Sequence, residues 1–271
     1  KKKQLLTEAK YGREAIINNV YILIDELWDL KVSGIGIGSA GRINTDTGII
    51  DYATDNLPGW TGFDVKGAIE KKYGLPVFVD NDVNTAAIGE AWIGAGRGYK
   101  NLFMMALGTG VGGAIILNNE LIRGSHWSAG EIGHSILYPG GKQCNCGQKG
   151  CLEQYISGSA IYKRYNKICG YNKVKNAMEV FDLYLKNDSI SKIVIDEFVN
   201  LLSLSIISLK NIIDPDLFII GGGLIGAKDI WWSKLIKSLD KYKNIDVKYA
   251  ELGNDATMIG AAKLILDRLN K

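Results

Sequence analysis

Apolar residues recur along this chain at two different spacings, and each spacing predicts a different kind of element. Ile16, Val20 and Leu23 are three or four positions apart, so residues 14–30 would present one apolar face as a helix. Polar residues precede several such stretches, as they do where helices begin. The further helices expected from this pattern cover residues 64–73, 82–92, 228–239 and 256–269, and helices should dominate residues 158–212.

Short apolar runs bounded by glycine or polar residues predict strands between these helices. Residues 102–107 form such a run, and a later strand should return to Ile122 after a turn at Asn118 and Asn119. Residues 41–60 are expected to be rich in loops. Because strands alternate with helices, the pattern predicts an α/β protein. The other expected strands are 32–38, 77–79, 217–220 and 246–251.

The composition excludes several classes of protein. At 271 residues the chain can form one large domain or two moderate lobes, and its 46% hydrophobic content suffices for a core. The net charge of +3 comes from 32 basic and 29 acidic residues, so no global attraction to DNA or an anionic membrane is expected. No apolar run approaches the length of a membrane-spanning helix, and no stretch resembles a signal peptide. We therefore expect a cytoplasmic protein that binds neither membranes nor nucleic acid.

Glycine is abundant and clustered, with 33 glycines against four prolines. Residues 32–38 alternate glycine with isoleucine, which predicts a buried strand whose backbone closely approaches another element. The clusters at 108–113 and 221–223 follow apolar strands and can expose backbone N–H groups to phosphate oxygens. A glycine-rich hairpin turn is the alternative for 108–113, which lacks the Gly-Lys-Ser/Thr of a P-loop. The positions expected to face a ligand are Gly108, Thr109, Gly110, Gly112, Gly221, Gly222 and Gly223.

The most specific pattern is a cluster of cysteine and histidine residues. His134, Cys144, Cys146 and Cys151 lie within eighteen positions. Three thiolates and one imidazole form the tetrahedral set that Zn²⁺ favours, and four protein ligands leave no position for a reactive water. Free thiols are the alternative, whereas disulfides are disfavoured because cysteines are sparse and a signal peptide is lacking. The cluster therefore predicts a structural zinc site.

Carboxylates provide the other candidate chemistry. Glu131 and Glu153 bracket the cluster, which suggests that the zinc shapes a polar pocket. Asp82 follows the expected strand 77–79 at the start of a helix. It can accept a proton from a hydroxyl that attacks a phosphoryl group. An aspartate in this position can equally serve as a helix cap, and the residues alone leave both roles open.

Together these segments resemble the ROK (repressor, open reading frame, kinase) family of sugar kinases. The resemblance implies the actin-like ATPase (ribonuclease H-like) α/β fold, with two lobes around a cleft. The smaller lobe is then expected to comprise residues 1–99 and 256–271, and the larger lobe residues 100–255 with the zinc loop. The matching segments are Glu131-Xaa-Gly133-His134, Cys144-Xaa-Cys146-Gly147-Xaa-Xaa-Gly150-Cys151-Xaa-Glu153, 108–113 and 214–223.

The resemblance also implies an activity. The protein would transfer phosphate from ATP, with Mg²⁺, to the 6-hydroxyl of a hexose, which would be glucose or an N-acetylhexosamine such as N-acetylglucosamine or N-acetylmannosamine. Asp82 would deprotonate this hydroxyl, and Asn81 would bind neighbouring ring hydroxyls. The loop 56–60 is similar to that of glucokinases, so the hexose stays open. The other sugar contacts implied are Glu131, His134 and Glu153, together with Gly41, Arg42 and Thr54 as in N-acetylhexosamine kinases.

The family pattern also includes a segment that the printed sequence does not contain. Family members begin with a strand and an Asp-Xaa-Gly-Gly-Thr phosphate loop, whereas this sequence runs from Lys1 almost directly into its first helix. We expect the loop to precede Lys1 in the natural protein; the other interpretation is a fragment that does not bind ATP productively. The alternative functions are a sugar-responsive ROK repressor with a DNA-binding segment ahead of Lys1, and a sugar-binding pseudokinase. The resemblance further implies a homodimer.

Overall fold

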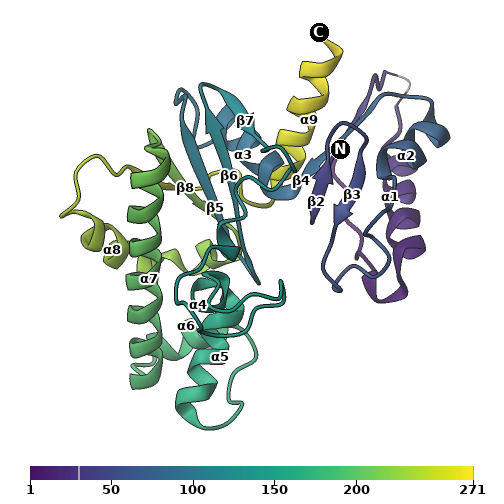
Figure 1. Cartoon of the computed structure of the whole chain (residues 1–271). Helices are drawn as coiled ribbons and strands as arrows, with labels where there is room; N and C mark the ends of the chain where they lie inside the picture. The colour runs from purple at the N-terminus through teal and green to yellow at the C-terminus, as the bar shows by residue number, and fades with distance from the viewer. Residues whose placement is uncertain (30, 271) are drawn as a thin grey trace. The chain divides into compact units, whose positions relative to one another are not determined.

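Strands and helices alternate through both compact units of the computed structural model, which describes residues 1–29 and 31–270 (Figure 1). Unit 1 comprises Lys1–Trp92, Arg123–Ala129 and Asp255–Lys271, and unit 2 comprises Ile93–Ile122 and Gly130–Asn254. The α/β class predicted from the sequence is confirmed. Residue 30 of the first predicted helix and residue 271 of the expected smaller lobe lie outside the described residues.

Unit 1 combines a short parallel sheet, a hairpin and the helices around them. Its apolar core contains side chains from the sheet, the hairpin and the helices, among them Ile17, Ile50, Ile69 and Val79. The elements are η1 (Ala9–Tyr11), α1 (Arg13–Leu27), β1 (Ile35–Ser39), β2 (Arg42–Asn44), β3 (Ile49–Tyr52), α2 (Val65–Tyr73), β4 (Val77–Asn81), α3 (Asp82–Ile93) and α9 (Ala256–Leu269), the last preceded by η4 (Gly253–Asp255).

α9 lies directly against the parallel pair formed by β1 and β4. The two strands are in register with Ser39 opposite Asn81. A side chain added to Gly36 of β1 would overlap the backbone of Ala261 in α9. The close approach predicted from the glycine alternation in residues 32–38 is therefore confirmed, and α9 is the element that requires it.

The β2–β3 hairpin lies where the sequence predicts loops. β2 and β3 pair antiparallel, with a register shift between Arg42 and Ile43, so the prediction for residues 41–60 is wrong in its first half. Ile43 and Ile50 are buried. The strands are nevertheless too short to show a two-residue period. The turn is closed by the side chain of Asn44, which accepts two backbone hydrogen bonds.

Unit 2 contains the larger set of elements. The helices predicted over residues 158–212 are three separate elements, because the chain turns at Gly170 (φ 86°) and because Asn176 and Asp188 each cap a new helix. The elements are β5 (Leu102–Leu107), β6 (Val111–Leu117), β7 (Glu120–Ile122), η2 (Ile132–His134), α4 (Glu153–Ile156), α5 (Gly158–Cys169), α6 (Ala177–Leu185), α7 (Ser189–Ile213), β8 (Leu217–Gly221), η3 (Gly223–Ala227), α8 (Lys228–Leu239) and β9 (Val247–Tyr249).

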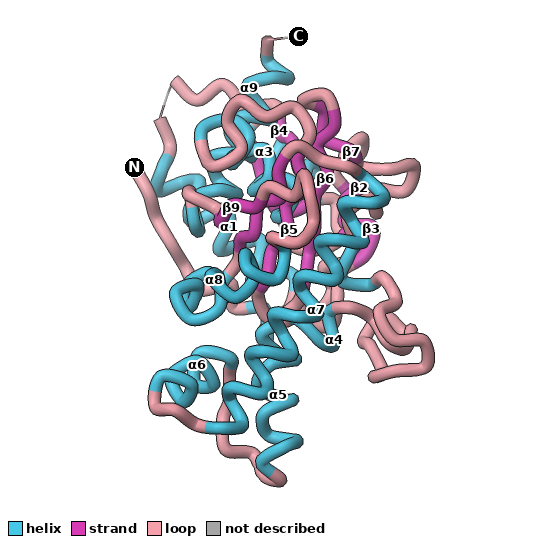
Figure 2. The backbone as a smooth tube through the Cα atoms, turned by 90° about the vertical axis from the view of Figure 1, so that its left-hand side faces the viewer, coloured by secondary structure: helices cyan, strands magenta, loops and turns pink. Residues whose placement is uncertain are grey.

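Within the described residues, unit 2 is built on a five-stranded mixed sheet with the order β7-β6-β5-β8-β9. β5 pairs in parallel with β8, while β6 pairs antiparallel with β5. α5 and α6 lie beyond the ends of these strands, and α7 runs from them along the sheet (Figures 1 and 2). Phe103, Phe198 and Trp231 pack in the core between the sheet and these helices. None of the described helices has both the length and the apolar character that crossing a membrane requires.

Candidate functional site

Asn81 organises the junction between β4 and α3. Its side-chain oxygen accepts hydrogen bonds from the backbone N–H groups of Val83 (2.8 Å) and Asn84 (3.1 Å). These are N–H groups of the first helical turn, so Asn81 acts as the cap of α3. Its side-chain nitrogen donates to the carbonyl of Gly41 (2.9 Å). The structure thus brings together two of the residues that the family resemblance assigns to the sugar.

Asp82 is the first residue of α3 and has a raised pKa. Burial is the largest cause, and it is opposed by hydrogen bonds from the backbone of Val83, from Asp82's own backbone and from the side chain of Asn81. The Thr85 and Thr257 hydroxyls donate to its backbone carbonyl (2.9 and 3.2 Å) and hold the residue in place. Asn81 caps the helix, and the Asp82 carboxylate shares the N–H of Val83 with it (3.0 Å). A carboxylate with a raised pKa suits proton transfer from a hydroxyl.

Asp80 is a polar residue of this junction that the sequence analysis does not assign. Its side chain is only 1% exposed, although it lies in an apolar strand. One carboxylate oxygen accepts from the backbone N–H of Asn81 (2.7 Å) and the side chain of Asn84 (2.9 Å), and the other accepts from Arg123 (2.8 Å). The signal available in the sequence is a charged residue at a position where the strand pattern calls for an apolar one.

The remaining sugar contacts implied for unit 1 lie around the β2–β3 hairpin. Gly41 has a φ of 106°, a conformation that favours glycine. Arg42 forms an ion pair with Asp51, and its guanidinium also donates to the Ser128 hydroxyl (3.3 Å). Thr54 is exposed. Arg42 is therefore already engaged within unit 1, and a sugar would have to share it with Asp51.

The cysteine and histidine residues form a compact group in unit 2. One ligand atom from each of His134, Cys144, Cys146 and Cys151 can be chosen so that all four lie within 4.8 Å of one another. The Sγ atoms of Cys146 and Cys151 are 3.5 Å apart, and Nδ1 of His134 is 3.7 Å from Sγ of Cys144. A tetrahedral zinc with Zn–S bonds of about 2.3 Å places its ligand atoms roughly 3.8 Å apart. The group can therefore hold a four-coordinate zinc ion.

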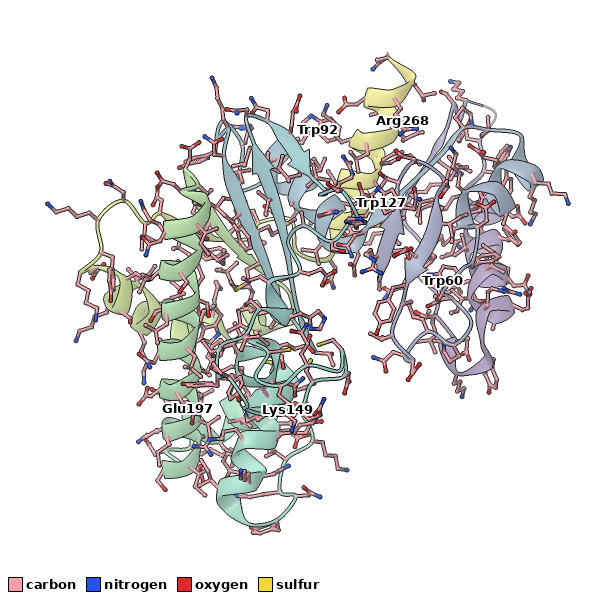
Figure 3. The ribbon with its side chains drawn as sticks, in the orientation of Figure 1. Trp60, Trp92, Trp127, Lys149, Glu197 and Arg268 are labelled. Carbon is pink, nitrogen blue, oxygen red and sulfur yellow. The ribbon has the colours of Figure 1, made fainter. Side chains whose placement is uncertain are left out.

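Backbone turns bring these side chains together. Gly147 and Gly150 both have φ near 90°, which permits the tight loop between the cysteines. A side chain on Gly150 would overlap the carbonyl of Tyr138. The side chain of Gln154 donates to Sγ of Cys144 at 3.5 Å, a contact of the kind that orients a metal ligand. Figure 3 shows sulfur atoms gathered in this segment, near the labelled Lys149.

The thiols of this group differ in their acidity. Burial raises the pKa of the Cys151 thiol to about 12, and hydrogen bonds with Cys146 and Cys144 add to the rise. Burial also tends to raise the pKa of the Cys146 thiol. Hydrogen bonds from the Gln148 backbone and the neighbouring thiols outweigh this effect, so the pKa of Cys146 lies below its usual value. Because thiolates are the ligands, metal binding has to displace the proton of Cys151.

Glu153 connects the cysteine segment to the glycine loop after β5. Its carboxylate accepts a hydrogen bond from the backbone N–H of Val111 at 3.0 Å. A side chain on Gly110 would overlap the same carboxylate, so only glycine fits there without a shift. His134 is the last residue of η2 and Glu131 immediately precedes this helix, in the same unit. Of the residues that the resemblance assigns to sugar hydroxyls in unit 2, Glu153 therefore contacts the loop that it assigns to phosphate.

A cavity of about 370 Å³ lies beside this loop, entirely within unit 2. Gly108 and Thr109 line it, as do residues at the first turns of α5 and α6. The carbonyl of Gly108 accepts the N–H of Gly158 (2.8 Å), which seats the loop on the start of α5. Backbone N–H groups and helix N-termini favour phosphate oxygens. Gly223 lines the same cavity, so both predicted ligand loops meet there.

Comparison with known proteins identifies the family. The sequence model of the ROK family matches residues 1–268. This chain belongs to the ROK family. It is 38% identical over 256 residues to a glucokinase of Halalkalibacterium halodurans, which covers 88% of this chain and 77% of that protein. The crystal structure of a ROK family glucokinase from Streptomyces griseus in complex with glucose and AMPPNP superposes with a TM-score of 0.82 at 29% identity, over 93% of this chain and 88% of that one. The predicted actin-like ATPase fold is confirmed.

Other ROK relatives are described as a kinase of another sugar and as a repressor. An N-acetyl-D-glucosamine kinase of Citrobacter koseri is 33% identical over 230 residues, which cover 79% of this chain and 73% of that protein. The xylose repressor of Bacillus subtilis is 28% identical over 243 residues, which cover 86% of this chain but 61% of the repressor. Membership of the ROK family is therefore compatible with several sugars, and with a regulatory as well as an enzymatic role.

Gly112, Gly221 and Gly222, three other glycines of the predicted phosphate loops, lie in or beside strands. Gly112 lies in β6, opposite Ala106 of β5, and the last three residues of the predicted loop 108–113 belong to this strand. Gly221 lies in β8, and Gly222, with a φ of 85°, rests against the backbone of Leu107. The residues that line the cavity include neither Gly221 nor Gly222. Their positions allow close approach between strands, a role that a glycine run in sequence does not distinguish from phosphate binding.

Proposed function

We propose that this protein is an ATP-dependent, hexokinase-type kinase that phosphorylates the 6-hydroxyl of a hexose. ROK relatives described as glucokinases and as an N-acetylglucosamine kinase support a sugar kinase. The observation that carries the proposal is the environment of Asp82. It stands at the start of α3, where burial raises its pKa although its carboxylate accepts the N–H of Val83, and Asn81 provides the cap of the helix.

In the proposed reaction Asp82 receives the proton of the 6-hydroxyl. The hydroxyl oxygen forms a bond to the γ-phosphorus of ATP, the bond from that phosphorus to the β–γ bridging oxygen breaks, and ADP leaves with the electron pair. Such transfers depend on positioning and charge neutralisation more than on covalent chemistry. The side chain of Asn81 bonds both Gly41 and Asp82, and we propose that it also contacts a ring hydroxyl next to the 6-hydroxyl.

The nucleotide is proposed to bind in the cavity beside Gly108 and Thr109. The N-terminus of α5 and the bared backbone of the loop would receive the phosphates, and Gly223 would lie beside the nucleoside. Mg²⁺ would enter with ATP and neutralise charge on the phosphate oxygens. No side chain of the described residues is assigned to Mg²⁺.

Zinc is proposed as a structural ion held by His134, Cys144, Cys146 and Cys151. When bound, it supplies rigidity rather than a reactive water, because its four positions are filled by the protein. Because Nδ1 of His134 faces Cys144, its other ring nitrogen is available for a sugar hydroxyl. Glu131 and Glu153 flank this segment and are proposed to bind further hydroxyls.

The activity is tested by measuring ADP formation with glucose, N-acetylglucosamine, N-acetylmannosamine, mannose and fructose. The assay uses the full-length natural protein, including any residues that precede Lys1. We expect turnover with at least one of these sugars. Asp82→Asn should remove most of it while leaving the fold intact, and Asp196→Asn, which alters a surface ion pair with Lys234, is the matched control. Near-normal turnover by Asp82→Asn would show that Asp82 is not the base.

A second candidate is a sugar-responsive repressor, which the likeness to the xylose repressor favours. Sequencing the natural protein upstream of Lys1 would separate the two. An Asp-Xaa-Gly-Gly-Thr loop there supports the kinase, whereas a helix-turn-helix domain supports the repressor. Sequence-specific DNA binding by the full-length protein, without ADP formation on any sugar, would replace the kinase proposal. A protein that binds sugar but neither forms ADP nor binds DNA would be a pseudokinase.

A further inference from the structure

Arg123–Ala129, which we term the crossover segment, belongs to unit 1 although β7 immediately before it belongs to unit 2. The segment is closed by the N–H of Ala129, which donates to the carbonyl of Arg123 (3.0 Å). Within it Trp127 has a φ of 53°. This left-handed conformation is costly for a bulky side chain and persists only where the surroundings hold it.

Arg123 fastens the crossover segment to the interior of unit 1. Its Nε and Nη2 atoms both lie 2.8 Å from one carboxylate oxygen of Asp80. The Asp80 side chain is 1% exposed and that of Arg123 is 26% exposed, so solvent screens this pair far less than a surface pair. Removing Arg123 would leave a buried carboxylate without its counter-charge, which is a strongly destabilising change.

The second oxygen of Asp80 acts on the junction that carries the proposed base. It accepts from the backbone N–H of Asn81 and from the side-chain amide of Asn84. Asn81 in turn caps the helix that begins at Asp82. The ion pair between Arg123 and Asp80 is therefore linked to Asp82 through Asn81, which bonds Asp80 and caps α3. The mechanism proposed above uses neither Asp80 nor Arg123.

We propose that Arg123 and Asp80 are positioning residues, which hold the β4–α3 junction so that the Asp82 carboxylate keeps the orientation needed for proton transfer. The inference rests on the proposed function, because it assigns the pair to the kinase reaction. Displacing a catalytic group by about 1 Å can lower turnover roughly 100-fold.

A double-mutant cycle on the full-length natural protein tests this inference. The values of kcat, and of KM for the hexose and for ATP, are measured for Arg123→Met, Asp80→Asn and the double variant, below the unfolding temperature of each. We expect each single variant to lose kcat roughly 10- to 100-fold, with KM for ATP changed by less than about twofold. The double variant should lose about as much as either single variant, because both changes break the same interaction.

Arg123→Lys provides a second test, in a variant that keeps a positive charge beside Asp80. We expect it to recover most of the stability lost in Arg123→Met but only part of kcat, because an ammonium does not reproduce the planar pair of N–H donors. Arg164→Met is the matched control. Arg164 pairs with Glu197 at 2.8 Å between α5 and α7 of unit 2, so its loss should leave kcat near that of the wild type. Glu197 is labelled on α7 in Figure 3.

Wild-type kcat in folded Arg123→Met would overturn the inference, and so would losses that multiply in the double variant. If Arg123→Met does not fold, Arg123→Lys and Asp80→Asn decide by the same criterion. If the wild-type protein phosphorylates no hexose, the proposed function is wrong and the inference falls with it. An active wild type whose turnover is insensitive to changes at Arg123 and Asp80 overturns the inference alone.

Discussion

The carboxylate of Glu153 accepts a hydrogen bond from the backbone N–H of Val111 at 3.0 Å, across 42 positions of sequence. The space for this contact exists because residue 110 is glycine, since any side chain there would overlap the same carboxylate. The bond joins the end of the cysteine segment to the loop after β5. Glu153, a proposed hydroxyl ligand, is therefore in direct contact with the proposed phosphate loop.

Gly110→Ala should disturb Glu153 and the proposed phosphate loop at once. The added methyl group has to displace the Glu153 carboxylate, which is the end of a flexible side chain, so the loss in the free energy of unfolding should be smaller than the ~1–3 kcal/mol of an overpacked core. We expect kcat/KM to fall for the hexose and for ATP together, and chemical denaturation to show the loss of stability. Gly226→Ala is the control, because a side chain there meets open space. If the two variants behave alike, the contact between Glu153 and residue 110 has no consequence.

The raised pKa of Asp82 predicts opposite effects of pH on activity and on stability. Activity needs the carboxylate, so kcat/KM should fall as pH is lowered through a pKa above the usual range of aspartate. For stability, a folded-state pKa above the unfolded value favours the protonated form. That contribution is fully present below the unfolded pKa and is lost as pH rises through the folded pKa.

Asp82→Asn should therefore lose activity without losing stability at neutral pH. We expect a fall in kcat of roughly 10²- to 10⁴-fold, the usual contribution of a general base. The thermal unfolding midpoint should be equal to or higher than that of the wild type, because a buried charge has been removed. A variant that unfolds earlier and retains its turnover would contradict both the assigned role and the sign of the pKa shift.

The cysteine group predicts a metal content and its dependence on pH. Purified protein should contain about one zinc per chain, since its four ligands complete one tetrahedral shell. Because metal binding has to displace the Cys151 proton, whose thiol has a pKa raised to about 12, zinc should be released more readily as pH is lowered. Metal analysis after dialysis at a series of pH values measures this release.

Cys146→Ser separates the role of the metal from that of the loop. It should lower the zinc content, the thermal unfolding midpoint and hexose affinity together, because the same segment carries Glu131 and Glu153. Cys169→Ser, which alters a cysteine outside the group, should leave all three unchanged. Metal-free protein with full stability and full hexose affinity would exclude a structural role for zinc.

Gly36→Ala tests the packing of α9 on β1. The methyl group would overlap the backbone of Ala261, and backbone yields less readily than a flexible side chain. We expect a loss of about 1–3 kcal/mol in the free energy of unfolding, as overpacked cores show. Urea denaturation measures the loss. Gly226→Ala is again the control, and equal midpoints for the two variants would show that α9 does not lie against the strand.

Local patterns account for most of the elements that the sequence predicts correctly. α1, α2, α3, α8 and α9 follow apolar spacing or polar starts, and β5 and β8 are uninterrupted apolar runs. The β2–β3 hairpin escapes prediction because its strands are short, with Ile43 and Ile50 buried singly rather than in a repeating pattern. Likewise, the glycine run 108–113 does not reveal in sequence that Gly112 belongs to a strand.

The metal group and the family motif are local, and this is why the sequence is enough to recognise them. His134, Cys144, Cys146 and Cys151 lie close together along the chain, so their residue types and spacing already specify the donor set. Asp80 and Arg123 are 43 positions apart and meet because β4 and the crossover segment pack in the same unit. Periodicity and motifs report how neighbouring residues share a face or a ligand. The choice of a distant partner depends on how the chain closes around a buried charge, and this pairing appears only in the folded protein.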